Sequence, residues 1–255
     1  MKLGFIGTGN ISSDVVTGIC ESKISFNKII LSPRSKKKSQ NLKKRFKKIQ
    51  IAKTNQEVVD KSDWVFIGVL PEIGENILPQ LKFRSKQTVI SFISTIDYSK
   101  LKKILKKKTN IVRAIPMPPI ALGKGPVIIF PPNKKVKSFF NKIGEAIEIK
   151  SEKLSQNFWS ISGTMASFYE MLKILSDWLV KKKIKRKQAQ NYTTSLYSAL
   201  AILAAENSKK DFRQFVINSQ TPGGLNWQGV NELRKVGYFK SLEKSINNIL
   251  KRLNK

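Results

Sequence analysis

After Met1 the chain reads Lys2-Leu3-Gly4-Phe5-Ile6-Gly7-Thr8-Gly9-Asn10-Ile11-Ser12, and this stretch decides the fold. Residues 2–6 are typical of a buried strand, and residues 11–22 of a helix with one apolar face. The turn between them fits G-x-G-x-x-S, a variant of the dinucleotide-binding fingerprint. Its first glycine permits a tight turn, and its second lets a pyrophosphate approach the backbone. The N–H groups of the helix start then face the phosphates, so we predict a phosphate cradle built from Gly7, Thr8, Gly9, Asn10 and Ile11.

The rest of the first half alternates short apolar runs with polar, helix-like stretches. A basic helix is expected at residues 35–47, and the apolar runs lie at residues 28–31, 63–67, 88–92, 110–114 and 127–130. Strands that alternate with helices are typical of β-α-β units around a parallel sheet. We therefore predict an α/β Rossmann domain with a parallel sheet over residues 1–150.

The second half has a helical pattern throughout. Residues 196–205 are apolar almost all round, so this helix is expected to be buried. A helical unit of about 100 residues often buries such a helix against a second copy of itself. We predict an all-α dimerisation domain over residues 151–255, in a homodimer or a higher oligomer of dimers.

The end of the second expected strand indicates which dinucleotide is bound. An NAD enzyme usually carries an acidic residue there to bind the ribose hydroxyls. This chain instead reads Ser32-Pro33-Arg34-Ser35-Lys36, in which Arg34, Ser35 and Lys36 are suited to grip a 2′-phosphate. The alternative is that Arg34 and Lys36 are ordinary surface charges of a basic chain. The pattern favours NADP(H) over NAD(H).

The chain is strongly basic, with 48 Lys and Arg against 17 Asp and Glu and a net charge of +31. This charge is compatible with a polyanion partner such as nucleic acid, or with a lysine-rich solvated surface. The lysine runs lie in separate segments and are not interleaved with aromatic residues, as a single-strand binding groove requires. We therefore expect no nucleic-acid partner, and a nucleic-acid binder remains an alternative based on charge alone.

The chain has no histidine and a single cysteine, Cys20. An intrachain disulfide is thus impossible, which fits a reducing compartment. The commonest metal ligand and the commonest general base are also missing, so no metal site is expected. No run approaches the ~18 apolar residues that span a membrane, and the first residues do not have the pattern of a signal peptide. We expect a cytoplasmic protein without a membrane partner.

Several segments together resemble one enzyme family almost from end to end. They are residues 4–10, Asn55, residues 62–71, Arg113–Pro119, Ser162–Ala166 and Thr221–Asn226. On these segments the sequence resembles the pyrroline-5-carboxylate reductases. The resemblance implies a Rossmann domain followed by a helical dimerisation domain. It also implies NAD(P)H-dependent reduction of a cyclic imino acid to proline, with the substrate at the interface of two intertwined subunits.

The resemblance also assigns roles to individual residues. On the cofactor side, Asn55 is expected near the adenosine, and Val69, Leu70 and Pro71 match a Val-Lys-Pro segment in which Leu70 replaces Lys. Ser32, at the end of the second expected strand, is a further cofactor-binding candidate. The residues expected to bind the substrate are Met117, Ser162, Gly163, Thr164, Gly223, Gly224 and Leu225. Thr221 and Asn226 are the catalytic candidates, and Asn226 stands where the family has a Thr that contacts the substrate ring.

The departures from the family pattern cluster on the substrate side. The family residues are replaced at Met117, Pro118, Met165, Ala166 and Asn226. An iminium is already protonated, so the absence of histidine does not oppose imine reduction. Three hypotheses follow: reduction of 1-pyrroline-5-carboxylate, reduction of another small imine or keto compound, and a non-catalytic NADP-binding protein. Structural alternatives exist as well, because residues 162–164 are compatible with a helix start and Pro222-Gly223-Gly224 with an ordinary turn.

Overall fold

The computed structural model describes residues 1–105 and 109–254. The chain forms two compact units, the first at residues 1–155 and the second from Gln156 onward. This division lies a few residues beyond the position near residue 150 that the sequence pattern suggests. Each unit is described separately below.

One sheet forms the centre of the first unit, and within the described residues it has eight strands. Their order is β3-β2-β1-β4-β5-β6-β7-β8. The strands are β1 (Lys2–Ile6), β2 (Lys28–Leu31), β3 (Ile49–Ile51), β4 (Trp64–Ile67), β5 (Thr88–Ser91), β6 (Asn110–Ile115), β7 (Pro126–Phe130) and β8 (Glu145–Glu148). Neighbouring strands are parallel except β6 and β7, which are antiparallel. The predicted parallel sheet is therefore mixed at this one pair.

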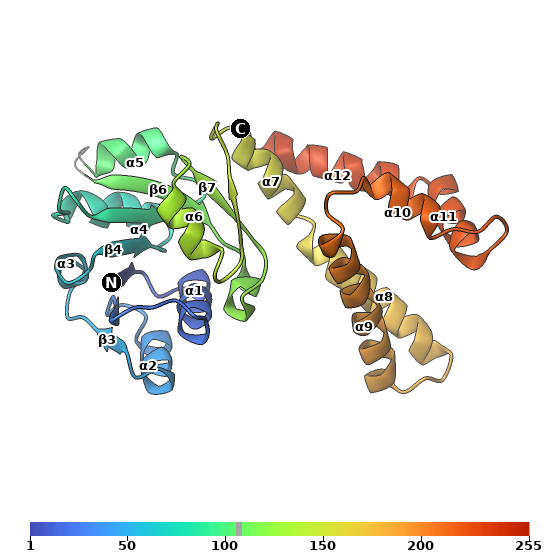
Figure 1. Cartoon of the computed structure of the whole chain (residues 1–255), viewed down its shortest axis with the longest axis horizontal. Helices are drawn as coiled ribbons and strands as arrows, with labels where there is room; N and C mark the ends of the chain where they lie inside the picture. The colour runs from blue at the N-terminus through green and yellow to red at the C-terminus, as the bar shows by residue number, and fades with distance from the viewer. Residues whose placement is uncertain (106–108, 255) are drawn as a thin grey trace. The chain divides into compact units, whose positions relative to one another are not determined.

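Helices cover both faces of the sheet (Figure 1). One face carries α1 (Asn10–Glu21), α2 (Lys36–Arg45) and α6 (Lys134–Phe140), and the other carries α3 (Asn55–Asp60), α4 (Pro71–Ile77) and α5 (Tyr98–Ile104). Alternate residues of a strand point to opposite faces, so Phe5 faces α1 while Ile6 faces α3. The Phe5 and Phe66 rings stack in the core between the sheet and α1, with centroids 4.5 Å apart.

A partly buried ion pair lies near the place where the chain leaves the first unit. Arg113 of β6 is 3% exposed and pairs with the carboxylate of Glu152. The same carboxylate accepts a hydrogen bond from the Tyr98 backbone N–H at 2.9 Å, and Arg113 also donates to the carbonyl of Ser94 at 2.6 Å. Burial lowers the pKa of the Arg113 guanidinium, and the Glu152 charge opposes that shift. The pair thus joins β6, the start of α5 and the residues that lead into the second unit.

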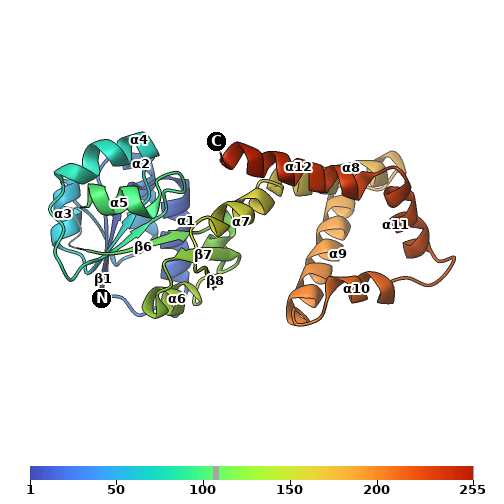
Figure 2. The same cartoon turned by 90° about the horizontal axis from the view of Figure 1, so that it is seen from above.

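The second unit consists of helices in the part of the chain that is described (Figure 2). They are α7 (Leu154–Ser162), α8 (Met165–Lys181), α9 (Arg186–Glu206), α10 (Phe212–Asn218), α11 (Leu225–Lys235) and α12 (Tyr238–Leu253). The two longest, α8 and α9, form a hairpin and pack through Ser176 and Thr193, whose hydroxyls lie 3.4 Å apart. None of the described helices is long and apolar enough to cross a membrane.

Within a single chain residues 196–205 are not buried, so their burial against a second copy stays a prediction. Leu200 is 51% exposed, Ile202 58% and Leu203 51%. Only Ala189 and Thr193 of α9 are buried, because α8 covers one side of this helix. An apolar face is therefore left open on α9.

Candidate functional site

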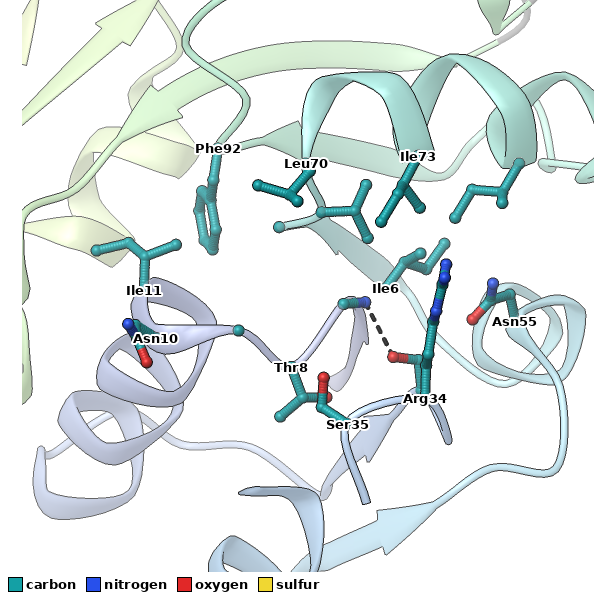
Figure 3. Close-up of a pocket in the computed structure, with 16 residues that line it drawn as sticks. Ile6, Thr8, Asn10, Ile11, Arg34, Ser35, Asn55, Leu70, Ile73 and Phe92 are labelled. Atoms are coloured by element: carbon teal, nitrogen blue, oxygen red, sulfur yellow. Dashed lines mark hydrogen bonds between the residues drawn. The ribbon is translucent and has the colours of Figure 1, made fainter. Parts of the chain in front are cut away.

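A cavity of about 520 Å³ lies at the carboxyl ends of β1, β2 and β4 (Figure 3). Strand order reverses here, because β1 pairs with β2 on one side and with β4 on the other. Open α/β sheets bind their ligands at such a point. The cavity is lined by Ile6, Gly7, Thr8, Gly9, Asn10, Ile11, Ser32, Arg34, Ser35, Asn55, Gly68, Val69, Leu70, Ile73, Ile77 and Phe92.

The turn at Gly7 can be made only by glycine. Its φ is +88°, and a Cβ there would lie 2.5 Å from the Gly68 carbonyl oxygen. The Gly7 N–H donates a hydrogen bond to the Ser32 hydroxyl at 2.9 Å, which ties the turn to the end of β2. Ser32 is thus placed at the site as expected, but its buried hydroxyl is engaged by the turn itself.

Three features of the turn fit a bound pyrophosphate. First, α1 begins after Gly9 with no side chain capping its N–H groups and no acid in its first turn. Second, a Cβ on Gly9 would meet only the Gly68 oxygen, at 3.8 Å, so the space above the turn is open. Third, Thr8 is fully buried, and its hydroxyl has no hydrogen-bond partner among the described residues. A buried hydroxyl without a partner is costly, so a ligand oxygen is a suitable partner for it.

The other end of the cavity fits an adenosine that carries a 2′-phosphate. Figure 3 shows the Arg34 side chain extended beside Asn55, which begins α3. Ser35 lies just before α2 and close to Thr8. None of the lining residues is Asp or Glu. The side chains present thus offer a guanidinium and a hydroxyl to an anion, and no carboxylate to ribose hydroxyls.

An apolar wall closes the cavity on the side of β4 and β5. Val69 and Leu70 follow β4, and Leu70 is 65% exposed at the rim. Pro71 begins α4 and is not among the lining residues. Sequence reasoning missed Phe92, Ile73 and Ile77. The usable signal for Phe92 was its position after β5, at the same sheet edge as the phosphate turn.

The residues expected to bind substrate are not gathered in this cavity. Met117 follows β6 in the first unit and is half-buried. The other candidates belong to the second unit, in two separate segments: the α7–α8 junction at residues 162–164, and the turn at residues 221–226 that starts α11. Within the first unit the structure therefore brings the cofactor candidates other than Pro71 together, whereas the substrate candidates of the second unit belong to two segments of the chain.

Two side-chain hydroxyls at the α7–α8 junction bond to the backbone of α7. The Ser162 hydroxyl donates to the Phe158 carbonyl at 3.2 Å, and the Thr164 hydroxyl donates to the Ile161 carbonyl at 2.7 Å. Thr164 occupies the position before α8, but its side chain does not cap that helix. Both hydroxyls thus bond backward to α7, which differs from the helix-start role considered above.

The turn before α11 is an exposed, glycine-dependent loop. Gly223 has φ +75°, and the N–H of Gly224 donates to the Thr221 carbonyl at 2.9 Å. The Asn226 side-chain amide donates to the Ser219 carbonyl at 2.8 Å, so it holds the loop in shape. Leu225 is 86% exposed. The loop presents these groups outward from the second unit.

Two family models match this chain, one in each unit. The model described as NADP oxidoreductase coenzyme F420-dependent matches residues 2–95. The model for pyrroline-5-carboxylate reductase dimerisation matches residues 152–255.

Full-length relatives agree with both matches. Pyrroline-5-carboxylate reductase 3 of Danio rerio is 24% identical over 249 residues, which cover 93% of this chain and 85% of the relative. The pyrroline-5-carboxylate reductase of Aquifex aeolicus is 25% identical over 263 residues, which cover 97% and 94%.

Solved structures show the same fold over the whole chain. A Coxiella burnetii pyrroline-5-carboxylate reductase gives a TM-score of 0.85 at 21% identity, covering 99% of this chain and 97% of that one. The Plasmodium falciparum pyrroline carboxylate reductase, solved with NADP bound, gives 0.84 at 23% identity with the same coverage. A reductive aminase from Aspergillus terreus is more distant, with a TM-score of 0.58 at 11% identity over 82% of this chain and 76% of that one. On the two family models and the near full-length matches, the chain belongs to the pyrroline-5-carboxylate reductase family.

Proposed function

We propose that this chain reduces a cyclic imino acid with NADPH, converting 1-pyrroline-5-carboxylate to L-proline. The observation that carries the proposal is the cavity at residues 7–11, with its open phosphate turn, the Arg34 guanidinium and no lining acid. It is supported by the match of the second unit to the dimerisation model and by relatives that carry the name pyrroline-5-carboxylate reductase. We place the reaction in the cytoplasm, in keeping with a single cysteine that has no intrachain partner.

The chain's own residues bind and orient the reactants. NADPH supplies the hydride, and the protein supplies binding and orientation. Gly7 to Ile11 hold the pyrophosphate, while Arg34 and Ser35 hold the 2′-phosphate and Asn55 the adenosine ribose. Pro71 acts by starting α4 behind the cavity wall rather than by direct contact. The protonated imine accepts the hydride without a strong protein acid, which suits a chain that has no histidine.

The second unit contributes the substrate groups. We assign the carboxylate of the substrate to Ser162, Gly163 and Thr164, and the ring to Thr221, Gly223, Gly224, Leu225 and Asn226, with Met117 beside it. Asn226 orients the ring through its amide but cannot donate as an acid. Because these residues lie in two segments of the second unit, we propose that a second copy of the chain completes the site in a homodimer.

A second candidate keeps the cofactor and changes the substrate. It is motivated by Met117, Pro118, Met165 and Asn226, where the family residues are replaced. Another small imine or a keto compound would then be reduced. A non-catalytic NADP-binding protein is the third candidate, and it rests on Asn226 alone.

The test is the initial rate of nucleotide oxidation with 1-pyrroline-5-carboxylate, measured with NADPH and with NADH. We expect turnover with a clear preference for NADPH, and we expect Arg34→Gln to raise KM for NADPH far more than for NADH. The variant Asn226→Thr restores the family residue and should retain or raise kcat. NADPH binding with turnover only on other imines or ketones favours the second candidate. Binding without turnover on any substrate of such a panel favours the third.

A further inference from the structure

Lys38 places a cation beside the phosphate turn, in addition to Arg34 at the adenosine end of the cavity. It projects from α2, and its Nζ donates a hydrogen bond to the side-chain oxygen of Asn10, the first residue of α1. Asn10 lines the cavity. Of the three consecutive lysines that begin α2, Lys38 is the one for which the described residues provide a side-chain hydrogen bond. Its ammonium is therefore held at the start of α1 while its neighbours project into solvent.

The surroundings of this ammonium favour an anion. The uncapped N–H groups of α1 begin at the same place, and a helix N-terminus carries a partial positive charge. The buried Thr8 hydroxyl without a partner lines the same cavity. One acid lies nearby: Asp14, one turn further along α1, whose pKa is raised by burial and lowered by the charge of Lys38. Lys38 thus offsets the carboxylate that would otherwise weaken anion binding at this helix start.

The Lys38 ammonium also has N–H donors that remain available to a ligand. A lysine side chain has three N–H donors and no acceptor, so one bond to Asn10 leaves two for a ligand. The bond to Asn10 restricts a long side chain before the ligand arrives, which lowers the entropy lost on binding. An amide oxygen is a neutral partner, so the positive charge of Lys38 is not neutralised by it.

We propose that Lys38 binds the pyrophosphate of the dinucleotide, the part that NADPH and NADH share, while Arg34 reads the 2′-phosphate that only NADPH has. The inference rests on the proposed cofactor site and assigns its two cationic side chains different roles. Lys38 sets the affinity for both nucleotides, and Arg34 sets the choice between them.

These two roles predict that substitutions of Lys38 and Arg34 change the nucleotide affinities differently. Lys38→Met should weaken NADPH and NADH by the same factor, about tenfold for the loss of one charge-assisted contact. Arg34→Gln should weaken NADPH and leave NADH almost unchanged. Lys38→Arg keeps the charge and should retain most of the affinity. Lys37→Met is the matched control, because Lys37 is an exposed neighbour on the same helix, and it should bind both nucleotides as the parent chain does.

The experiment is a titration of the full-length protein with NADPH and with NADH, without substrate, followed by calorimetry or by fluorescence, with the thermal unfolding midpoint recorded for every variant. Equal weakening by Lys38→Met at an unchanged midpoint supports the proposal. Unchanged affinities in Lys38→Met, or weakening of NADPH alone, overturn it. A parent chain that binds neither nucleotide overturns the cofactor site and Lys38's role together, whereas normal binding without turnover affects only the proposed reaction.

Discussion

Gly7 and Gly9 lie two residues apart in the same turn and have different physical roles. Gly7 has positive φ and no room for a Cβ, whereas Gly9 has φ −74° and open space above it. Gly7→Ala should therefore lower the free energy of unfolding by about 1–3 kcal/mol, the usual cost of such backbone strain. Gly9→Ala should leave stability nearly unchanged and weaken NADPH binding, because its methyl group projects into the cradle.

Denaturant unfolding and NADPH titration of both variants separate the two effects. Equal losses of stability in Gly7→Ala and Gly9→Ala would contradict this assignment of roles. An unchanged NADPH affinity in Gly9→Ala would show that the pyrophosphate does not approach the backbone at this residue.

Cys20 should make stability depend on pH at the alkaline end. It is half-buried beside the core of α1, and burial raises the pKa of its thiol from 9.0 to about 11. The folded protein therefore holds the thiol proton more tightly than the unfolded chain does. The resulting stabilisation is present below pH 9 and is lost as the pH rises toward 11. Compared with the parent chain, Cys20→Ala should show a shallower fall in thermal midpoint over this window, and identical slopes would refute the assignment.

At the scale of elements, Gly163 allows α12 to pack against the α7–α8 junction. A Cβ on Gly163 would lie 2.9 Å from the Ile249 Cδ1 atom of α12. Gly163→Ala should therefore destabilise the second unit by about 1–2 kcal/mol, as overpacking usually does. The double variant Gly163→Ala with Ile249→Val should recover part of that loss, because valine lacks the Cδ1 methyl group.

The double variant also separates packing from substrate binding. If Gly163 serves only packing, the double variant should recover KM for the imino acid along with stability. Recovered stability with a KM that stays raised would support its place in the substrate site. No recovery of stability would show that Ile249 is not the group that Gly163→Ala displaces.

The apolar runs of the sequence predict some strands of the sheet and miss others. The runs at residues 28–31, 63–67 and 88–92 became β2, β4 and β5 within a residue of expectation, because a strand buried on both faces needs a continuous apolar run. β3 and β8 were missed, since they are short and carry Gln50 or Glu145 and Glu148 among few apolar residues. The antiparallel direction of β7 depends on the path of the chain through residues 116–125, which periodicity does not encode.

At the scale of the whole molecule, the open face of α9 should hold two copies together. Leu196, Leu200 and Leu203 are each more than 40% exposed on one chain. Exposed apolar faces of this kind are typical of subunit interfaces. Leu200→Lys should shift the chain toward monomer, as measured by light scattering after size exclusion, and should abolish turnover while NADPH binding persists. Asn76→Lys, an exposed site on α4, is the matched control and should change neither property. A monomeric parent chain with full activity would contradict a shared site.

The sequence by itself determined the phosphate turn, because a strand, two glycines and a helix start in immediate succession leave few other conformations. It also determined the change near residue 150 from strands alternating with helices to helices alone, since buried strands and amphipathic helices space their apolar residues differently. Only the tertiary structure decided which side chains meet at the turn. Ser32, Asn55 and Phe92 line the cavity around it and Lys38 contacts Asn10, and these four residues come from separate segments of the chain. Their approach depends on strand order and sheet twist rather than on spacing along the chain. For the same reason, the exposed face of α9 could be read only from the structure, because α8 covers Ala189 and Thr193 and leaves Leu196, Leu200 and Leu203 of the same helix exposed.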